Sequence, residues 1–79
     1  MSGLANLTVT ELVAPNGDVI VRAECDWPNP AYPRYAVTSR EWETTVGDVA
    51  VRTAHHRDRA ITSLASAVAV EADRLAAKS

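Results

Sequence analysis

The sequence predicts an α+β fold, an antiparallel four-stranded sheet made of two β-hairpins with one C-terminal helix packed on one face. Two observations carry this prediction. Residues 19–27 alternate between apolar and polar side chains, as a half-buried strand does. Residues 57–78 instead carry apolar side chains at the spacing of one helix face. We expect a single small domain over residues 1–79, because a chain of this length supports one small core.

A Pro-Asn-Gly turn at residues 15–17 separates the first two expected strands. Proline suits the first central position of a type I turn, and glycine suits the left-handed position that follows it. Counting outward from this turn places Val13 opposite Val19 and Val9 opposite Ala23. Both strands therefore turn most of their apolar residues toward the same side.

The same register sets three residues against the pattern. Glu11 falls opposite Val21 on the apolar side, while Leu12 falls opposite Ile20 on the outer side. We expect Leu12 and Ile20 to form an exposed apolar pair that can contact another protein. Residues 1–6, which precede this hairpin, are expected to be a flexible N-terminus.

Residues 27–34 read WPNPAYPR and contain three of the four prolines of the chain. Proline removes a backbone donor and restrains the residue before it, so this segment suits neither a central strand nor a helix interior. We expect a stiff Pro-rich loop. Its aromatic residues Trp27 and Tyr32, with Tyr35 following, either cover the edge of a small core, which is the commoner role, or meet a protein partner.

A second hairpin is predicted around residues 46–49, which read Val-Gly-Asp-Val. Glycine at the first central position is typical of a two-residue type II′ turn. The register of such a turn places Thr44 opposite Val51 on one face and Glu43 opposite Arg52 on the other. Charge and burial agree in this register, which favours the hairpin.

An alternative stays open for the same segment. Thr38 and Glu41 match the spacing of a helix capping box, so residues 39–45 also fit a short helix. A longer terminal helix starting after Asp48 would accompany that alternative.

The terminal helix is expected to bury a stripe that contains Ile61, Leu64, Val68 and Leu75. Val70 lies on the opposite face among small residues, so it is a further candidate for contact with a protein. With the strands, the stripe predicts the following buried residues: Val9, Val13, Val19, Val21, Ala23, Val51, Ile61, Leu64, Val68 and Leu75.

Metal-binding and catalytic arrangements are poorly supported. Cys25 is the only cysteine, and it falls in the inward register of its strand, where a thiol is a core residue and not an exposed nucleophile. His55 and His56 are adjacent and therefore point in different directions, unlike helical zinc ligands at i and i+4. Glu41 and Glu43 share an expected solvated face. We expect no metal site, no cofactor and no enzymatic activity.

The densest basic cluster, which we call the basic cluster throughout, consists of Arg52, His55, His56, Arg57 and Arg59. At the start of the expected helix it would reinforce the anion affinity of free backbone N–H groups. This supports an alternative function, a regulator that binds DNA or RNA. The other interpretation, which the sequence slightly favours, is a solvated junction in which the cluster pairs with Glu41 or Glu43. The net charge of −2 and the pI of about 5.5 argue against indiscriminate binding to nucleic acid or to an anionic membrane.

Taken together, these patterns predict a small non-enzymatic cytoplasmic protein that binds another protein or itself as a homodimer. Arginine greatly outnumbers lysine, which is typical of GC-rich coding in actinobacteria and their phages, and a phage protein would act on a host protein. No apolar run has the length of a membrane span. The expected protein-binding residues are Trp27, Tyr32, Tyr35, Leu12, Ile20 and Val70.

Overall fold

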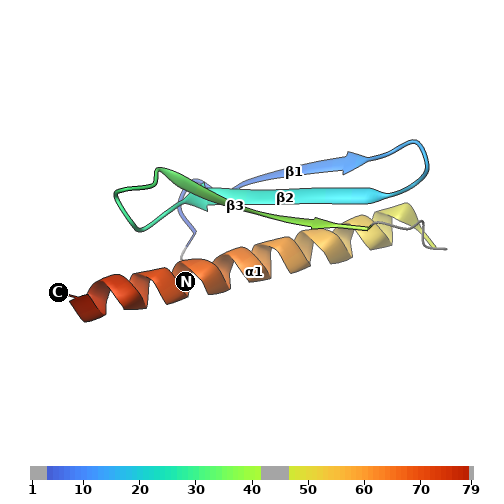
Figure 1. Ribbon diagram of the computed structural model, residues 1–79. Coiled ribbons are helices and arrows are strands. Elements are labelled where there is room, and N and C mark those ends of the chain that lie inside the picture. The colour runs from blue at the N-terminus through green and yellow to red at the C-terminus, as the bar shows by residue number, and fades with distance from the viewer. Residues whose placement is uncertain (1–3, 42–46, 79) are drawn as a thin grey trace.

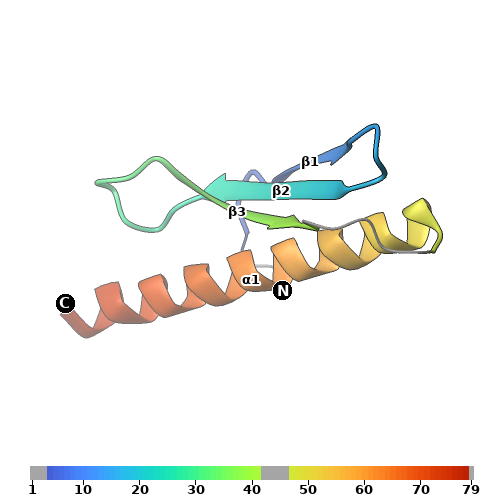
Figure 2. The same cartoon turned by 45° about the vertical axis from the view of Figure 1, so that its right-hand side comes forward.

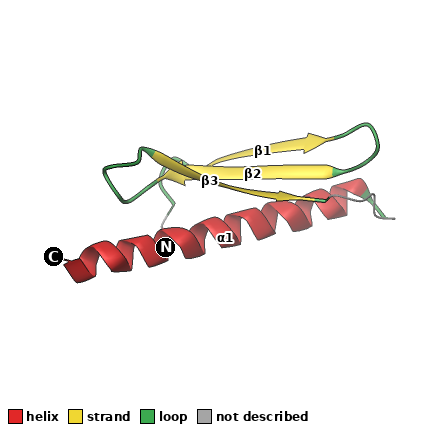
Figure 3. Cartoon of the chain, in the orientation of Figure 1, coloured by secondary structure: helices red, strands yellow, loops and turns green. Residues whose placement is uncertain are grey.

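The computed structural model describes residues 4–41 and 47–78, which form three strands and one helix in two layers (Figure 1). The elements in chain order are β1 (Thr8–Val13), β2 (Val19–Asp26), β3 (Arg34–Arg40) and α1 (Val49–Lys78). The strands form one antiparallel sheet in the order β1-β2-β3, and α1 runs along one face of it (Figure 3). The α+β class and the C-terminal helix are confirmed, whereas a fourth strand is not seen in the described residues.

The first hairpin has the predicted register. Its pairs run from Thr8 opposite Glu24 to Val13 opposite Val19. At the turn, Gly17 has a φ of 92° and donates its N–H to the carbonyl three residues earlier at 2.9 Å. Glycine adopts this left-handed conformation without steric cost because it has no Cβ. The turn chemistry and the period of two together fix which side of each strand faces the helix.

The predicted second hairpin is wrong. Residues 49–53, expected as its returning strand, form the start of α1. Asp48 acts as the N-cap, because its Oδ1 accepts the Ala50 N–H at 2.7 Å. Gly47, with a φ of 141°, precedes the cap, so the glycine and aspartate start a helix where the pattern predicted a tight turn.

Of the alternative interpretation of this segment, only the longer terminal helix is confirmed. A terminal helix does start after Asp48, but Ser39 and Arg40 belong to β3, so a short helix does not begin at residue 39. Residues 42–46, which carry the rest of the predicted third strand and its pairing, lie outside the described residues.

The core is a thin layer between β2 and α1. Its apolar members alternate along β2 and recur at i and i+4 on α1. Val9, Ile61, Val68 and Leu75 are half-buried. The fully buried apolar residues of the core are Val19, Val21, Ala23, Cys25, Ala60 and Leu64.

Two residues predicted to be buried are exposed. Val13 is 45% exposed, because it ends an edge strand that lies at the margin of the helix. Val51 is 67% exposed, because it belongs to a helix instead of a strand. Five residues before the buried His56, it is turned about 140° away from the buried face.

The helix is much longer than the sheet that it covers. Thirty residues at about 1.5 Å each give a rod of about 45 Å, while the eight residues of β2 span only about 26 Å. The C-terminal turns of α1 therefore extend beyond the sheet, as both views show (Figures 1 and 2). Within the described residues, the helix lacks the apolar length that a membrane crossing requires.

Candidate functional site

One surface hollow lies beside the Pro-rich loop, and we call it the aromatic hollow. It measures about 410 Å³, and the aromatic residues Trp27, Tyr32 and Tyr35 line it together with Glu71 and Arg74 of α1. The rings of Trp27 and Tyr35 pack against each other with centroids 4.4 Å apart and planes tilted by 32°. The structure therefore brings together the three aromatic residues that the sequence singled out.

The Pro-rich loop holds its shape through hydrogen bonds that its non-proline residues supply. Asn29 Oδ1 accepts the Ala31 N–H at 2.9 Å, and the Asn29 carbonyl accepts the Tyr32 N–H at 3.0 Å. These local bonds form the kind of turn that asparagine promotes. Tyr32 is left 60% exposed and Tyr35 42% exposed, while Trp27 is half-buried.

A charged bridge on α1 borders the aromatic hollow. Arg74 donates from Nε to Glu71 Oε1 at 2.7 Å and from Nη2 to Glu71 Oε2 at 2.6 Å. Asn29 Nδ2 also donates to Glu71 Oε2, at 3.0 Å, which ties the loop to the helix. The hydrogen bonds from Arg74, reinforced by the one from Asn29, lower the pKa of Glu71 from about 4.5 to about 2.

The Glu71 bridge is expected to contribute to stability above about pH 4.5 and to stop contributing near pH 2. Because the pKa of Glu71 is lower in the folded protein, the unfolded chain takes up the proton first as the pH falls. Thermal unfolding of the protein and of Glu71→Gln, which keeps an acceptor for Asn29 but does not titrate, measures this. The difference in Tm should shrink through that window, and a difference that stays constant to about pH 2 would contradict the assignment.

The remaining apolar residues predicted for protein binding lie away from the aromatic hollow. Leu12 is opposite Ile20, as the register requires, at the turn end of the sheet on the face without the helix. Leu12 is 58% exposed and Ile20 is half-buried. Val70 is 69% exposed on α1. None of the three lines the aromatic hollow, so their role in protein binding stays a separate prediction.

Arginine residues on the open face of the sheet are paired with acidic side chains. Arg34 contacts Asp26 at 2.9 Å and Glu24 at 3.4 Å, and Arg22 lies 3.7 Å from Glu24. Arg34 also donates to the carbonyl of Asn6 at 2.9 Å, which ties the N-terminal segment to the sheet. This face therefore presents alternating charges and not a basic stripe.

The basic cluster is dispersed by the early start of α1. Arg52 and His56 turn inward, and Arg57 reaches Glu11 on β1 at 3.6 Å. This ion pair with Arg57 explains why Glu11, a charged residue, occupies the apolar side of the first hairpin. His55 and Arg59 are exposed.

A buried polar network joins β3 to α1, where the sequence predicted only a solvated pairing of the basic cluster with Glu41 or Glu43. Ser39 Oγ and His56 Nδ1 are 2.7 Å apart, and His56 Nε2 lies 3.4 Å from Glu41 Oε1. Arg52 Nη2 donates to Glu41 Oε2 at 2.9 Å, and this hydrogen bond raises the pKa of Arg52. Arg52 also donates to the carbonyl of Gly17, so one guanidinium connects the first turn, the end of β3 and α1.

The network was detectable in principle. Glu41 follows the last residue of β3 and continues its ladder through the N–H bonded to Val19, so it shares a face with Ser39, two residues earlier. Arg52 and His56 are four residues apart in a helix and also share a face. A serine, a histidine and a carboxylate are also the components of a nucleophilic triad. Here Ser39 is only 8% exposed and Arg52 holds the carboxylate, so the geometry favours a structural clamp.

Two further observations concern chemistry at the surface and in the core. Burial raises the pKa of the Cys25 thiol, which disfavours the reactive thiolate. Among residues 4–41 and 47–78, no group of three or more His, Cys, Asp or Glu side chains is placed to hold a metal ion.

Comparisons with protein-family models, with curated proteins and with solved structures give no match to this chain.

Proposed function

We propose that the protein is a non-enzymatic binding module that holds another protein through the aromatic hollow. The observation that carries the proposal is the placement of the aromatic residues. The fully buried core is made of valine, alanine, leucine and cysteine. Trp27, Tyr32 and Tyr35 instead surround a surface hollow, and the two tyrosines are exposed. Partly exposed tyrosine and tryptophan are enriched among the residues that dominate the energy of protein interfaces.

The hollow combines an apolar wall with polar groups at its rim. The stacked rings of Trp27 and Tyr35 supply a rigid apolar surface, and few rotatable bonds must be ordered when a partner contacts it. Asn29, Arg34 and Arg74 place donors around this surface. An apolar or aromatic side chain of the partner, flanked by backbone carbonyls or carboxylates, suits this arrangement.

Nucleic-acid binding through the basic cluster remains the rival function. It needs several cations that can reach phosphates at the same time. Arg52 is engaged with Glu41, His56 with Ser39 and Arg57 with Glu11. The net charge of −2 further favours a protein partner over a polyanion.

The test compares Tyr32→Ala with Leu12→Ala, because both side chains are more than half exposed and neither change should unfold the protein. A partner is captured from cells, purified, and titrated against each variant by calorimetry. Tyr32→Ala is expected to weaken binding by about 30-fold, the effect of a typical interface hot spot. Leu12→Ala should change the affinity less than about twofold.

Light scattering on the purified protein runs beside this test, because the captured partner can be a second copy of the chain. A homodimer that Tyr32→Ala dissociates would assign the hollow to self-association. Equal affinities of the two variants would contradict the proposal. So would salt-sensitive, submicromolar binding to an oligonucleotide duplex that is lost in an Arg57→Ser, Arg59→Ser double variant and accompanied by no bound protein.

A further inference from the structure

β3 forms an edge of the sheet whose backbone groups are offered to another strand. The Glu41 N–H donates to the Val19 carbonyl at 3.0 Å, so odd-numbered residues of this segment bond toward β2. The backbone N–H and C=O groups of Ala36 and Thr38 therefore point away from β2. Such an edge is the template on which an extended peptide adds as a further strand.

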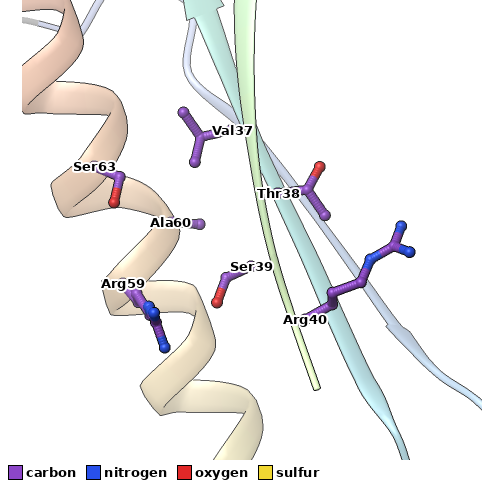
Figure 4. Close-up of a pocket in the computed structure, with 7 residues that line it drawn as sticks. All are labelled: Val37, Thr38, Ser39, Arg40, Arg59, Ala60 and Ser63. Atoms are coloured by element: carbon purple, nitrogen blue, oxygen red, sulfur yellow. The ribbon is translucent and has the colours of Figure 1, made fainter. Parts of the chain in front are cut away.

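A hollow of about 520 Å³ lies along this edge, between β3 and α1, and we call it the edge groove. Val37 and Ser39 point toward the helix, while the side chains of Thr38 and Arg40 point to the other side of the strand (Figure 4). All four residues line the groove, so it opens at the edge of β3 and not behind its face.

Small side chains form the helix wall of the edge groove. Ala60 and Ser63 of α1 face the strand edge across the groove. Because neither side chain is large, a strand beside β3 can turn its own side chains inward toward the helix. The groove therefore has space for alternate residues of an added strand as well as backbone partners for it.

The charge of the edge groove selects the kind of strand. Arg40 and Arg59 line it, and none of its described lining residues is acidic. Among the described residues Arg59 makes no ion pair, and its side chain is exposed. Asp58 is turned by about 100° from Arg59, and both residues line a second, open hollow on α1 together with His55, Thr62 and Ser63.

We infer that the edge groove binds an extended acidic peptide segment, which adds to the sheet as a fourth strand beside β3. Its backbone bonds to the outward groups of Ala36 and Thr38, and an inward carboxylate pairs with Arg59. The next inward residue, two positions along, lies near Val37 and Ala60, where a small apolar side chain fits. The recognised pattern is an acidic residue and an apolar residue separated by one position.

A second copy of the chain is a poorer occupant of the same groove. Pairing β3 with its counterpart would bring two Arg59 side chains to one seam, and neither of them has an ion-pair partner among the described residues. Like charges facing each other across a strand pair are destabilising. The arginines that disfavour self-pairing attract an acidic strand.

The inference goes beyond the proposed function, because the edge groove and the aromatic hollow share no lining residue. The probe is the fluorescein-labelled peptide Thr-Glu-Thr-Val-Thr-Glu-Thr-Val-Thr, titrated with the full chain by fluorescence anisotropy. A peptide with lysine in place of glutamate is the charge control. The glutamate peptide should bind at least about tenfold more tightly than the lysine peptide, and binding should shift the amide resonances of Ala36 and Thr38.

Variants of the protein test whether Arg59 is the cation that pairs with the glutamate of the peptide. Arg59→Ser should weaken binding of the glutamate peptide by about tenfold, while Arg57→Ser, on the side of the helix that faces Glu11, should change it less than about twofold. Arg59→Glu should prefer the lysine peptide. Tyr32→Ala should bind the glutamate peptide normally, so failure at one surface can be told from failure at the other.

Variants of the peptide test the backbone bonds. One version is N-methylated at its threonines and another at its inward residues. The inference requires that one of these two methylated peptides loses its binding to the protein. The identity of the peptide that loses binding shows whether the added strand is parallel or antiparallel to β3. The inference is overturned if the glutamate peptide does not bind, if both methylated versions bind as well as the parent, or if the Arg59 variants leave the preference unchanged. It is also overturned if the shifts of the Ala36 and Thr38 amide resonances arise from self-association of the protein and not from binding of the peptide.

Discussion

Replacing Leu64 by alanine is expected to lower the free energy of unfolding by about 3 kcal/mol. Leu64 is fully buried and is the largest side chain in the core between β2 and α1. Its truncation removes apolar burial and leaves a cavity that the sheet cannot close without losing other contacts. Because a domain of this size has a total stability of about 4–12 kcal/mol, this one change removes a large share of it.

Urea unfolding followed by circular dichroism measures this effect, with Val70→Ala as the matched control on the same helix. Val70 is 69% exposed, so its truncation should change the unfolding free energy by less than about 0.5 kcal/mol. Similar losses in the two variants would show that α1 does not pack on the sheet through Leu64.

The second large effect is expected for His56→Leu, which should destabilise the protein by about 2 kcal/mol. The imidazole is 5% exposed and lies between the hydroxyl of Ser39 and the carboxylate of Glu41. Leucine keeps the bulk of the side chain but leaves that hydroxyl buried without its partner, and an unsatisfied buried polar group costs more than a hydrogen bond contributes.

A double-mutant cycle isolates the pair. Ser39→Ala removes the orphaned hydroxyl, so the double variant Ser39→Ala, His56→Leu should be more stable than the sum of the two single losses predicts. Each variant is unfolded in urea under identical conditions. Strict additivity would mean that the contact between Ser39 and His56 does not contribute to stability.

The first hairpin could be predicted in register because two independent signals agree there. The turn at residues 15–17 sets the offset, and the alternation in β2 sets which side is buried. Both signals are local, so no knowledge of the rest of the fold is needed. The core residues of β2, such as Val19 and Val21, follow directly from them.

The second hairpin failed because its local signals are ambiguous. The Gly47-Asp48 pair suits a tight turn and also a helix start, and the β-branched residues Val49 and Val51 favour a strand. The packing of α1 on the sheet decides between a strand and a helix in this segment, and the first inward positions of its packed face are Arg52 and His56. Those residues are polar, so an apolar stripe could not reveal that the helix already covers the sheet there.

Of the aromatic hollow, only the wall formed by the loop and its aromatic residues could be predicted from the sequence, and the helix wall could not. Trp27, Tyr32 and Tyr35 are close in sequence, and the prolines between them place the first two in a loop that ends where β3, with Tyr35, begins. Glu71 and Arg74 lie some forty residues later, and their position beside the loop depends on how α1 docks on the sheet. The dispersal of the basic cluster has the same origin, because the direction of each cation follows from where the helix begins.

The length of α1 also determines which parts of the molecule open together. Turns of a helix that have few buried contacts open at a lower free-energy cost than turns held by the core, and local unfolding starts there. The buried residues of α1 end at Leu64, so its last turns form the least protected part of the helix. The helix wall of the aromatic hollow, Glu71 and Arg74, belongs to these turns. A partner bound there would therefore order a fluctuating helix end, and part of its binding energy would be spent on suppressing that fraying.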